Sequence, residues 1–248
     1  MIGTDLSSHQ EGVTIAELKA KGLEFVIIKA TQGTHYVNPF GAAFYSEACA
    51  EGLPAGAYCY SEATTPQQAQ LEAYYLLERI RGCPMPCGVW LDVEDPEQLR
   101  MDAGDLTEAV RAWCEVIRAA GYVPGVYSSE HSAWAKLDRD ALGDDVLVWV
   151  ARYGRRPDMP CDLWQYTDRE PIQGHECLLD LDVVTPGSRL ETMLRAAQEA
   201  TSEPAADGKT PDISGALALL AAYLQTEEFA RGFREFLERR CDPDGTNQ

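Results

Sequence analysis

Two carboxylates stand two residues apart in the segment WLDVED, which covers residues 90–95. The apolar run before them predicts a strand over residues 88–93, and side chains two positions apart on a strand share a face with Cα atoms ~6.6 Å apart. Asp92 and Glu94 should therefore project together, and Val93 should point the other way. Two close carboxylates do not ionise independently, so one keeps its proton to higher pH. A proton-donating acid beside a carboxylate that stabilises a cationic transition state is suited to hydrolysing glycosidic bonds.

In a chain with 40 Asp and Glu residues, such a pair is also common as a solvated surface feature or as part of a metal site. Three further acids favour a functional site. Asp5 ends a predicted first strand in GTDLSSHQ, and Asp180 and Asp182 lie in LLDLDVV, the predicted last strand. First and last strands are neighbours in a closed barrel, so both can bring carboxylates to one rim. Asp5 alone has a second interpretation as a turn or helix cap, because Ser7 and Ser8 follow it.

Side chains able to hold a sugar fall on neighbouring predicted strands. Tyr58 and Tyr60 share a face of the strand at residues 54–60, whereas Tyr127 and Gln165 end later strands. Aromatic faces stack on sugar rings, and hydroxyl and amide groups bind their polar edges. We expect these four residues and Asp182 to contact substrate, with buried packing as the alternative for each tyrosine. Lys29 is either a charge partner of the acids or a further substrate contact.

The elements that must position these residues alternate along the chain, as in a parallel α/β fold. Apolar, β-branched and aromatic runs predict strands, and spacings of three and four predict helices between them. Their number favours an irregular (β/α) TIM-like barrel, with Trp149 and Trp164 in its core. After residue 146 the connections are too short or too rich in proline for full helices. The predicted strands cover residues 24–29, 54–60, 88–93, 123–127, 146–152 and 163–166, and the predicted helices cover residues 14–21, 40–51, 66–81 and 106–120.

The C-terminal part of the chain differs in composition from the rest. We assign residues 1–199 to the catalytic barrel and residues 200–212, which are rich in turn formers, to a linker. Residues 213–241 form a helical appendage in which a leucine stripe and a phenylalanine stripe point to different sides of a helix. The appendage has three interpretations: packing onto the barrel, homo-oligomerisation, or docking to a cell wall.

The net charge of −19 disfavours nucleic acid as a partner, because phosphate binding needs clustered Lys and Arg. No apolar run is long enough to insert into a membrane. The first ten residues lack the basic start and apolar run of a signal peptide, so we expect synthesis in the cytoplasm. The eight cysteines lack paired zinc-site spacing, and only four histidines are present. We therefore expect reduced cysteines, no metal and no cofactor.

Eight motifs from residue 2 to residue 186 resemble, in order, the lysozymes of glycoside hydrolase family 25. The resemblance implies an irregular (β/α) barrel that cleaves the β-1,4 bond of bacterial peptidoglycan between N-acetylmuramic acid and N-acetylglucosamine. Without a signal peptide, it further implies a phage or prophage endolysin that reaches the wall after release. The motifs are GTDLSSHQ, FVIIKATQGTHYVNP, AGAYCY, VWLDVE, GYVPGVYSS, WVARYG, LWQYT and DLDVV.

By position in these motifs, Glu94 resembles the general acid of the family and Asp92 its partner. Asp5 and Asp180 would complete the acidic floor. Asp180 is favoured over Asp182, because the family's aspartate usually stands first in that tripeptide. Asp92 is poorly placed to attack the sugar from the opposite face, so we favour a retaining route in which the substrate's 2-acetamido oxygen attacks, with inversion by water as the rival.

Three positions depart from the family pattern. Gln32 stands where the family often has Glu, Asn38 where Asp commonly precedes Pro, and Cys59 where His is often found. None is one of the two central acids, and Cys59 should face away from the neighbouring tyrosines. We expect activity to survive, with a changed pH dependence or subsite preference.

Three other functions fit parts of the sequence. A sugar-binding barrel without turnover would keep the cleft, but the intact Asp92 and Glu94 disfavour it. A metal-dependent hydrolase such as a deacetylase would use the acids as ligands, but such sites normally include histidines, and His9 alone lies near the proposed rim. A hydrolase of a chitin-like polymer would differ by lacking a pocket for the lactyl group of muramic acid.

Overall fold

The computed structural model describes residues 1–202, with the side chains of residues 1–199. The helical segment predicted at residues 213–241 lies outside the described residues, as does most of the predicted linker at residues 200–212. Helix α7 extends to Ser202, so the first three residues assigned to the linker are helical.

Nine strands form one sheet in the order β1-β9-β8-β7-β6-β5-β4-β2-β3, and β1 pairs with β2 to close eight of them into a barrel. Neighbours from β1 through β2 and β4 to β8 are parallel, whereas β9 is antiparallel to both β8 and β1. The predicted irregular α/β barrel is therefore confirmed. The strands are β1 (Ile2–Leu6), β2 (Val26–Gln32), β3 (Tyr36–Val37), β4 (Ala55–Tyr60), β5 (Val89–Asp92), β6 (Pro124–Ser129), β7 (Leu147–Ala151), β8 (Leu163–Pro171) and β9 (Leu178–Val184).

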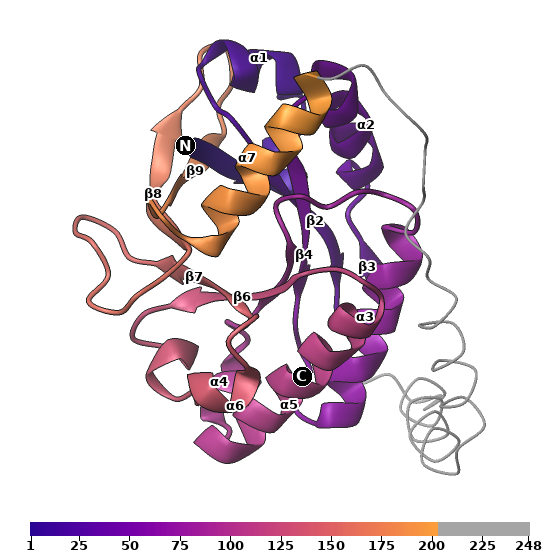
Figure 1. The fold of residues 1–248 in the computed structure, drawn as a ribbon, viewed down its shortest axis with the longest axis vertical. Coiled ribbons are helices and arrows are strands. Elements are labelled where there is room, and N and C mark those ends of the chain that lie inside the picture. Colours follow the sequence, from indigo (N-terminus) through magenta and orange to yellow (C-terminus); the bar gives the residue numbers. More distant parts are fainter. Residues whose placement is uncertain (203–248) are drawn as a thin grey trace. The chain divides into compact units, whose positions relative to one another are not determined.

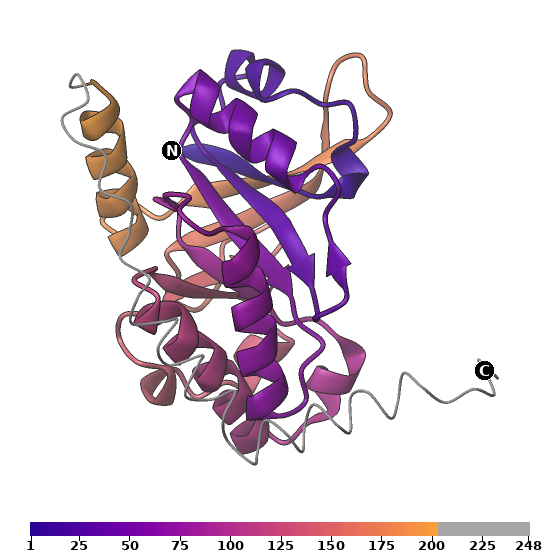
Figure 2. The same cartoon turned by 90° about the vertical axis from the view of Figure 1, so that its right-hand side faces the viewer.

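Helices surround the central sheet (Figures 1 and 2). They are α1 (Ile15–Ala20), α2 (Gly41–Glu51), α3 (Pro66–Arg79), α4 (Pro96–Arg100), α5 (Ala103–Ala119), α6 (Arg139–Leu142) and α7 (Arg189–Ser202), with 3₁₀ turns η1 (Ser8–Gln10) and η2 (Ala133–Ala135). The start of α3 follows from its residues: the Thr65 side chain accepts a hydrogen bond from the Gln68 backbone, and Pro66 occupies the first turn, where its missing N–H costs nothing.

The second half of the barrel has the short connections that the sequence predicts. Between β6 and β7 lie only η2 and the four-residue α6. Residues 152–162, all within the described chain, join β7 to β8 without a helix, and β8 returns directly as β9. The hairpin strand β3 and the short helices α4 and α6 were not predicted, because elements of two to five residues carry too little periodicity to recognise.

Large aromatic side chains fill the barrel interior. Trp90 and Trp149 are buried with ring centroids 5.4 Å apart at an edge-on angle, which favours the pair beyond its burial. Space for Trp90 comes from Gly125 on β6, where an added Cβ would lie 2.2 Å from the indole ring. Any side chain at position 125 would therefore displace the Trp90 ring, which contacts Trp149.

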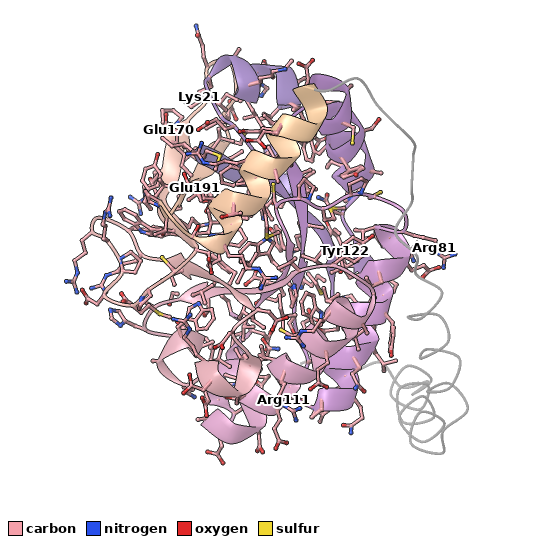
Figure 3. All side chains as sticks on the ribbon, in the orientation of Figure 1. Lys21, Arg81, Arg111, Tyr122, Glu170 and Glu191 are labelled. Atoms are coloured by element: carbon pink, nitrogen blue, oxygen red, sulfur yellow. The ribbon has the colours of Figure 1, made fainter. Side chains whose placement is uncertain are left out.

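An ion pair joins the first helix to the antiparallel strands. The Lys21 ammonium at the end of α1 lies 2.5 Å from the Glu170 carboxylate on β8 (Figure 3).

Among the described residues, no helix combines the length and apolar character required to cross a bilayer.

Candidate active site

Four carboxylates meet in one cavity of about 150 Å³ at the carboxyl ends of the parallel strands. Asp92 is the last residue of β5 and Glu94 lies two residues further on, whereas the Val93 side chain between them is fully buried. Asp5 on β1 lies directly opposite Asp180 on β9. The lining residues are Asp5, Tyr58, Asp92, Glu94, Tyr127, Trp149, Tyr153, Gln165 and Asp180.

Gln165 on β8 connects three of the cavity's side chains. Its Nε2 donates to Asp5 Oδ2 at 2.8 Å, and its Oε1 accepts hydrogen bonds from the hydroxyls of Tyr127 and Tyr153, both at 2.9 Å. The amide orientation is therefore determined from both ends. Because Gln165 is buried, these bonds hold Asp5 and both phenols in fixed positions.

We expect Gln165→Leu to lower the free energy of unfolding by about 1–3 kcal/mol, because Leu leaves Asp5 and two hydroxyls without their partner. Turnover should fall as well, since Asp5 and Tyr153 lose their fixed positions. Urea denaturation measures the first effect, and turnover of the cell-wall polymer that the family resemblance implies measures the second. Tyr153→Phe is the matched control, because it removes one of these hydrogen bonds and keeps Gln165. A Gln165→Leu protein as stable and active as wild type would contradict this role.

Burial and neighbouring charge both act on the acids of the antiparallel pair. The pKa of Asp5 lies well above its usual value because the side chain is buried, and the charge of Asp180 adds to the effect. Burial, together with the charge of Asp168, raises the pKa of Asp180 to about 6. These two acids therefore hold protons at pH values where an exposed carboxylate is ionised.

The central pair is shifted in the same direction. Burial raises the pKa of Glu94, and a hydrogen bond from the Ser129 backbone opposes the shift. Burial and the charge of Glu94 raise the pKa of Asp92, whereas the Lys29 ammonium acts in the opposite direction. Lys29 thus acts electrostatically on Asp92, which agrees with the charge-partner role, one of the two that the sequence leaves open for it. Asp92 Oδ1 is buried and has no hydrogen-bond partner among the described residues.

Lys29 is held beside the cavity by aromatic rings and an amide. Its ammonium lies 5.0 Å from the ring centroid of Tyr60 and 5.7 Å from that of Tyr36, within the range of cation–π attraction. Its Nζ donates to Gln32 Oε1 at 2.9 Å, and Gln32 Nε2 donates to Glu62 Oε1 at 2.8 Å. Gln32, one of the three departures, therefore orients Lys29 and links it through hydrogen bonds to the Glu62 carboxylate.

The other two departures lie inside the structure. Asn38 is buried and donates from Nδ2 to the Lys29 backbone carbonyl at 2.8 Å. Cys59 is buried on the face of β4 away from the cavity, as its position between two tyrosines predicts. Asn38, which follows β3, therefore contacts the backbone of β2 beside the site, and Cys59 belongs to β4, which carries Tyr58.

The sequence profile described as "Glycosyl hydrolases family 25" matches residues 4–175, a span that includes Asp5, Asp92 and Glu94. The chain belongs to glycosyl hydrolase family 25. Asp180 and Asp182 lie beyond the matched span, so the register of β9 against β1 is what places Asp180 in the cavity.

Curated relatives of this family 25 chain include enzymes of bacterial and fungal origin. The "Autolytic lysozyme" of Clostridium acetobutylicum is 29% identical over 190 residues, which cover 75% of this chain and 56% of that protein. The "N,O-diacetylmuramidase" of Chalaropsis sp is 27% identical, covering 66% of this chain and 83% of that protein. The chain therefore spans little more than half the length of the autolytic lysozyme.

Solved structures share the fold. The CTP1L endolysin superposes with a TM-score of 0.68 at 24% identity, covering 79% of this chain and 69% of that one. A family 25 glycosyl hydrolase from Bacillus anthracis superposes with a TM-score of 0.66 at 20% identity, covering 78% of this chain and 92% of that one.

The structure corrects three expectations, for Asp182, Trp149 and Trp164. Asp182 was predicted to bind substrate, but its side chain is fully buried and accepts a hydrogen bond from Trp149 Nε1 at 2.8 Å. Trp149 was predicted to be core alone, yet it also lines the cavity, so Asp182 fixes part of the cavity floor from below. Trp164 is partly exposed and donates to the Arg152 carbonyl at 2.7 Å.

The predicted sugar-binding residues are divided between two places. Tyr58, Tyr127 and Gln165 line the cavity with the acids. Tyr60 lies outside that lining and packs under Lys29 at its side. Tyr58 and Tyr127 are both buried, which raises the pKa of each phenol and keeps it a hydrogen-bond donor.

Two residues of the site were missed in the sequence. Tyr153 lines the cavity and is 50% exposed, and Asp168 on β8 acts on the pKa of Asp180. Tyr153 follows the end of β7 by two residues, a position where side chains reach the rim of a barrel, so its place in WVARYG was a usable signal. Asp168 offered no such signal, because its strand runs five residues past the predicted end.

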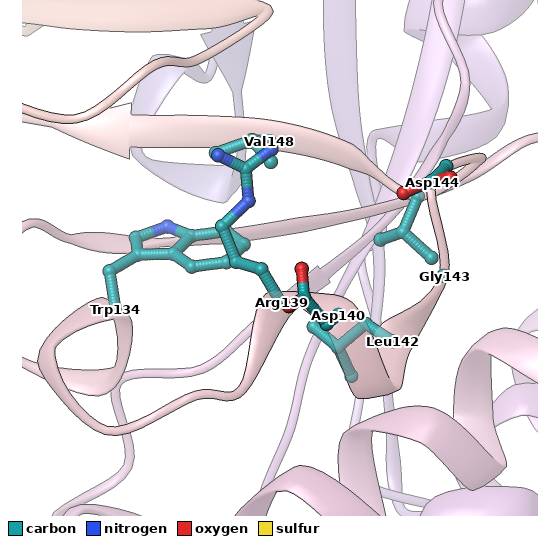
Figure 4. A pocket seen from close by; sticks show the side chains of 8 residues that line it. Trp134, Arg139, Asp140, Leu142, Gly143, Asp144 and Val148 are labelled. Atoms are coloured by element: carbon teal, nitrogen blue, oxygen red, sulfur yellow. The ribbon is translucent and has the colours of Figure 1, made fainter.

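A larger cavity of about 210 Å³ lies apart from this chemistry, beneath η2 and α6 (Figure 4). Trp134, Arg139 and Asp140 are among its lining residues. Trp134 Nε1 already donates a hydrogen bond to the Trp149 carbonyl, at 3.0 Å. Within the described part of the chain, no group of three His, Cys, Asp or Glu side chains is arranged to hold a metal ion.

Proposed function

We propose that this family 25 chain hydrolyses the β-1,4 bond between N-acetylmuramic acid and N-acetylglucosamine in bacterial peptidoglycan. The observation that carries the proposal is the meeting of four carboxylates and three tyrosines in one cavity at the carboxyl end of the barrel. Relatives named lysozyme and N,O-diacetylmuramidase agree with it.

Glu94 acts as the general acid. It is partly exposed at the cavity and its raised pKa keeps a proton available, as protonation of the leaving oxygen requires. The phenols of Tyr58 and Tyr127 remain protonated at neutral pH, so they do not compete for the proton. Tyr58 donates to a sugar oxygen, whereas the Tyr127 hydroxyl donates to Gln165.

Asp92 orients the 2-acetamido group of the sugar whose bond is cleaved. Asp92 lines the cavity, where its carboxylate is the acceptor for the acetamido N–H. The acetamido oxygen then attacks the anomeric carbon, the glycosidic bond breaks as Glu94 protonates the leaving oxygen, and water opens the resulting ring with retention of configuration. Attack by water with inversion is the alternative route.

The chain acts on the wall after synthesis in the cytoplasm and release, as an endolysin does. Its relatives include proteins named lysozyme from Lactococcus phage mv1 and Streptococcus phage Cp-7. Peptidoglycan is accordingly the partner proposed here.

The deciding experiment measures the reducing ends released from purified Gram-positive peptidoglycan. We expect muramic-acid ends to accumulate with wild-type protein. Glucosamine ends would mean that the other glycosidic bond is cleaved, and activity on chitin alone would point to a different polymer. Wall binding by well-folded protein without any release would indicate a sugar-binding barrel.

A further inference from the structure

The connection between β7 and β8 begins with a cluster of positively charged residues at the edge of the cavity, although the chain as a whole is negatively charged. Residues 152–156 read RYGRR, and no other five-residue window of the chain holds three basic residues, although acids outnumber bases by 40 to 21. The connection reaches away from the barrel at the left of Figure 1, where side chains ending in nitrogen gather in Figure 3.

The base of this loop is fixed by buried contacts. Arg152 forms an ion pair with Glu130, and both side chains are more than nine-tenths buried. The same Glu130 carboxylate accepts hydrogen bonds from the backbone N–H groups of Asp158 at 2.5 Å and Met159 at 3.1 Å. Arg139, which also lines the cavity of Figure 4, donates to the Pro160 carbonyl at 3.2 Å. The loop is therefore preformed, which reduces the entropy lost when a ligand binds.

The tip of the loop presents the two remaining guanidinium groups to solvent. Arg155 is 64% exposed and pairs with Asp158, itself 65% exposed, at 3.0 Å, and such an open pair exchanges readily with other anions. Arg156 is exposed and has no ion-pair partner among the described residues. Both lie within three residues of Tyr153, hence within roughly 11 Å of it along the chain.

An anion attached to the bound sugar has few favourable places near this site. The cavity is lined by Asp5, Asp92, Glu94 and Asp180, none of which offers an anion a cationic partner, and each of them that is ionised repels negative charge over roughly 10 Å at moderate salt. On the β2 side the charge of Lys29 is already shared with Asp92. On the β7–β8 side, Arg155 and Arg156 stand just beyond Tyr153 and point into solvent.

We propose that Arg155 and Arg156 form a binding site for the carboxylates of the peptide stem that the muramic acid carries. This inference rests on the proposed function, under which the muramic acid occupies the cavity that Tyr153 lines. Guanidinium groups bind carboxylates in bidentate geometry, so the loop recognises an anionic substituent that the acidic cavity itself repels. The loop thereby selects peptidoglycan with charged stems over neutral glycans.

The test compares binding to two polymers in a Glu94→Gln background, so that the polymer stays intact. One is insoluble peptidoglycan freed of teichoic acid, and the other is the same material with its carboxylates converted to neutral amides. Sedimentation at low salt measures the dissociation constant. We expect Arg155→Gln/Arg156→Gln to weaken binding to the charged polymer about three- to thirtyfold. Binding to the neutral polymer should not change, and the difference should vanish at 1 M salt.

The matched control is Arg81→Gln/Arg111→Gln, which removes two exposed charges distant from the loop (Figure 3). An equal loss in the control would show an effect of net charge and overturn the proposal. It would also be overturned by no loss, by equal loss on both polymers, or by loss only when teichoic acid is retained. If wild-type protein releases no reducing ends while the binding pattern holds, the proposed hydrolysis fails and the carboxylate site stands.

Discussion

Replacement of Glu94 by Gln is expected to lower kcat on peptidoglycan by about 10²–10⁴-fold, the contribution typical of a general acid. Gln keeps the size and hydrogen-bonding capacity of the side chain but has no proton to give to the leaving oxygen. Reducing-end release under saturating polymer measures the effect. Binding should be nearly unchanged, because the lost interaction is made only in the transition state.

The same substitution should leave stability intact. Burial raises the folded-state pKa of Glu94 above its unfolded value. The ionised carboxylate therefore costs folding free energy once the pH exceeds the unfolded pKa of about 4.3. Gln removes that cost, so Tm at pH 7 should equal or exceed that of wild type, and any gain should disappear below pH 4. An inactive variant with a lower Tm would mean that misfolding explains the loss, and an active one would remove Glu94 from the mechanism.

Much of the acid cluster follows from the sequence because strand geometry is regular. The spacing of Asp92 and Glu94 after an apolar run predicted that both share one cavity, and the alternation continues past the end of β5, with Val93 fully buried between them. Closure of the barrel then brought Asp5 and Asp180 together from its first and last strands, and their carboxylates line that cavity as well.

Depth within the barrel was the property that the sequence did not reveal. Asp180 and Asp182 share a face of β9, but β9 runs antiparallel to β1, so the later residue lies deeper. Asp182 consequently meets Trp149 instead of the cavity opening. A period-two pattern cannot give this direction, because it is the same for parallel and antiparallel strands.

The hydrogen-bond partners of Gln165 could not be predicted from the sequence either. Gln165 was predicted to bind substrate, yet in the structure its amide is engaged by Asp5, Tyr127 and Tyr153. Those partners come from strands β1 and β6 and from the end of β7, and only the closed barrel brings them within reach of one amide. The residue therefore determines the shape of the cavity as much as its polarity.

Asp92→Asn is expected to lower kcat by about 10²–10³-fold, in the range for removal of one preorganised electrostatic contact. The carboxylate stabilises the charge that develops as the acetamido oxygen attacks, and Asn supplies no negative charge. The effect is measured as kcat on peptidoglycan, with Tm as the check on folding. Because burial and Glu94 raise the pKa of Asp92, Asn should not lower Tm at pH 7.

The route of attack decides what Asp92 does, and the stereochemistry of the first product reveals it. If the acetamido group attacks, wild-type protein should release the β-anomer first, and polymer whose muramic acid lacks the N-acetyl group should resist cleavage. Both results would agree with the Asp92 carboxylate at the cavity as the acceptor of the acetamido N–H. Release of the α-anomer first would instead make Asp92 the base that activates water. In an inverting glycosidase the two carboxyl groups lie about 6.5–9.5 Å apart, which leaves room for the attacking water. The anomer released first therefore also tests whether two acids only two residues apart can act from opposite faces of the sugar.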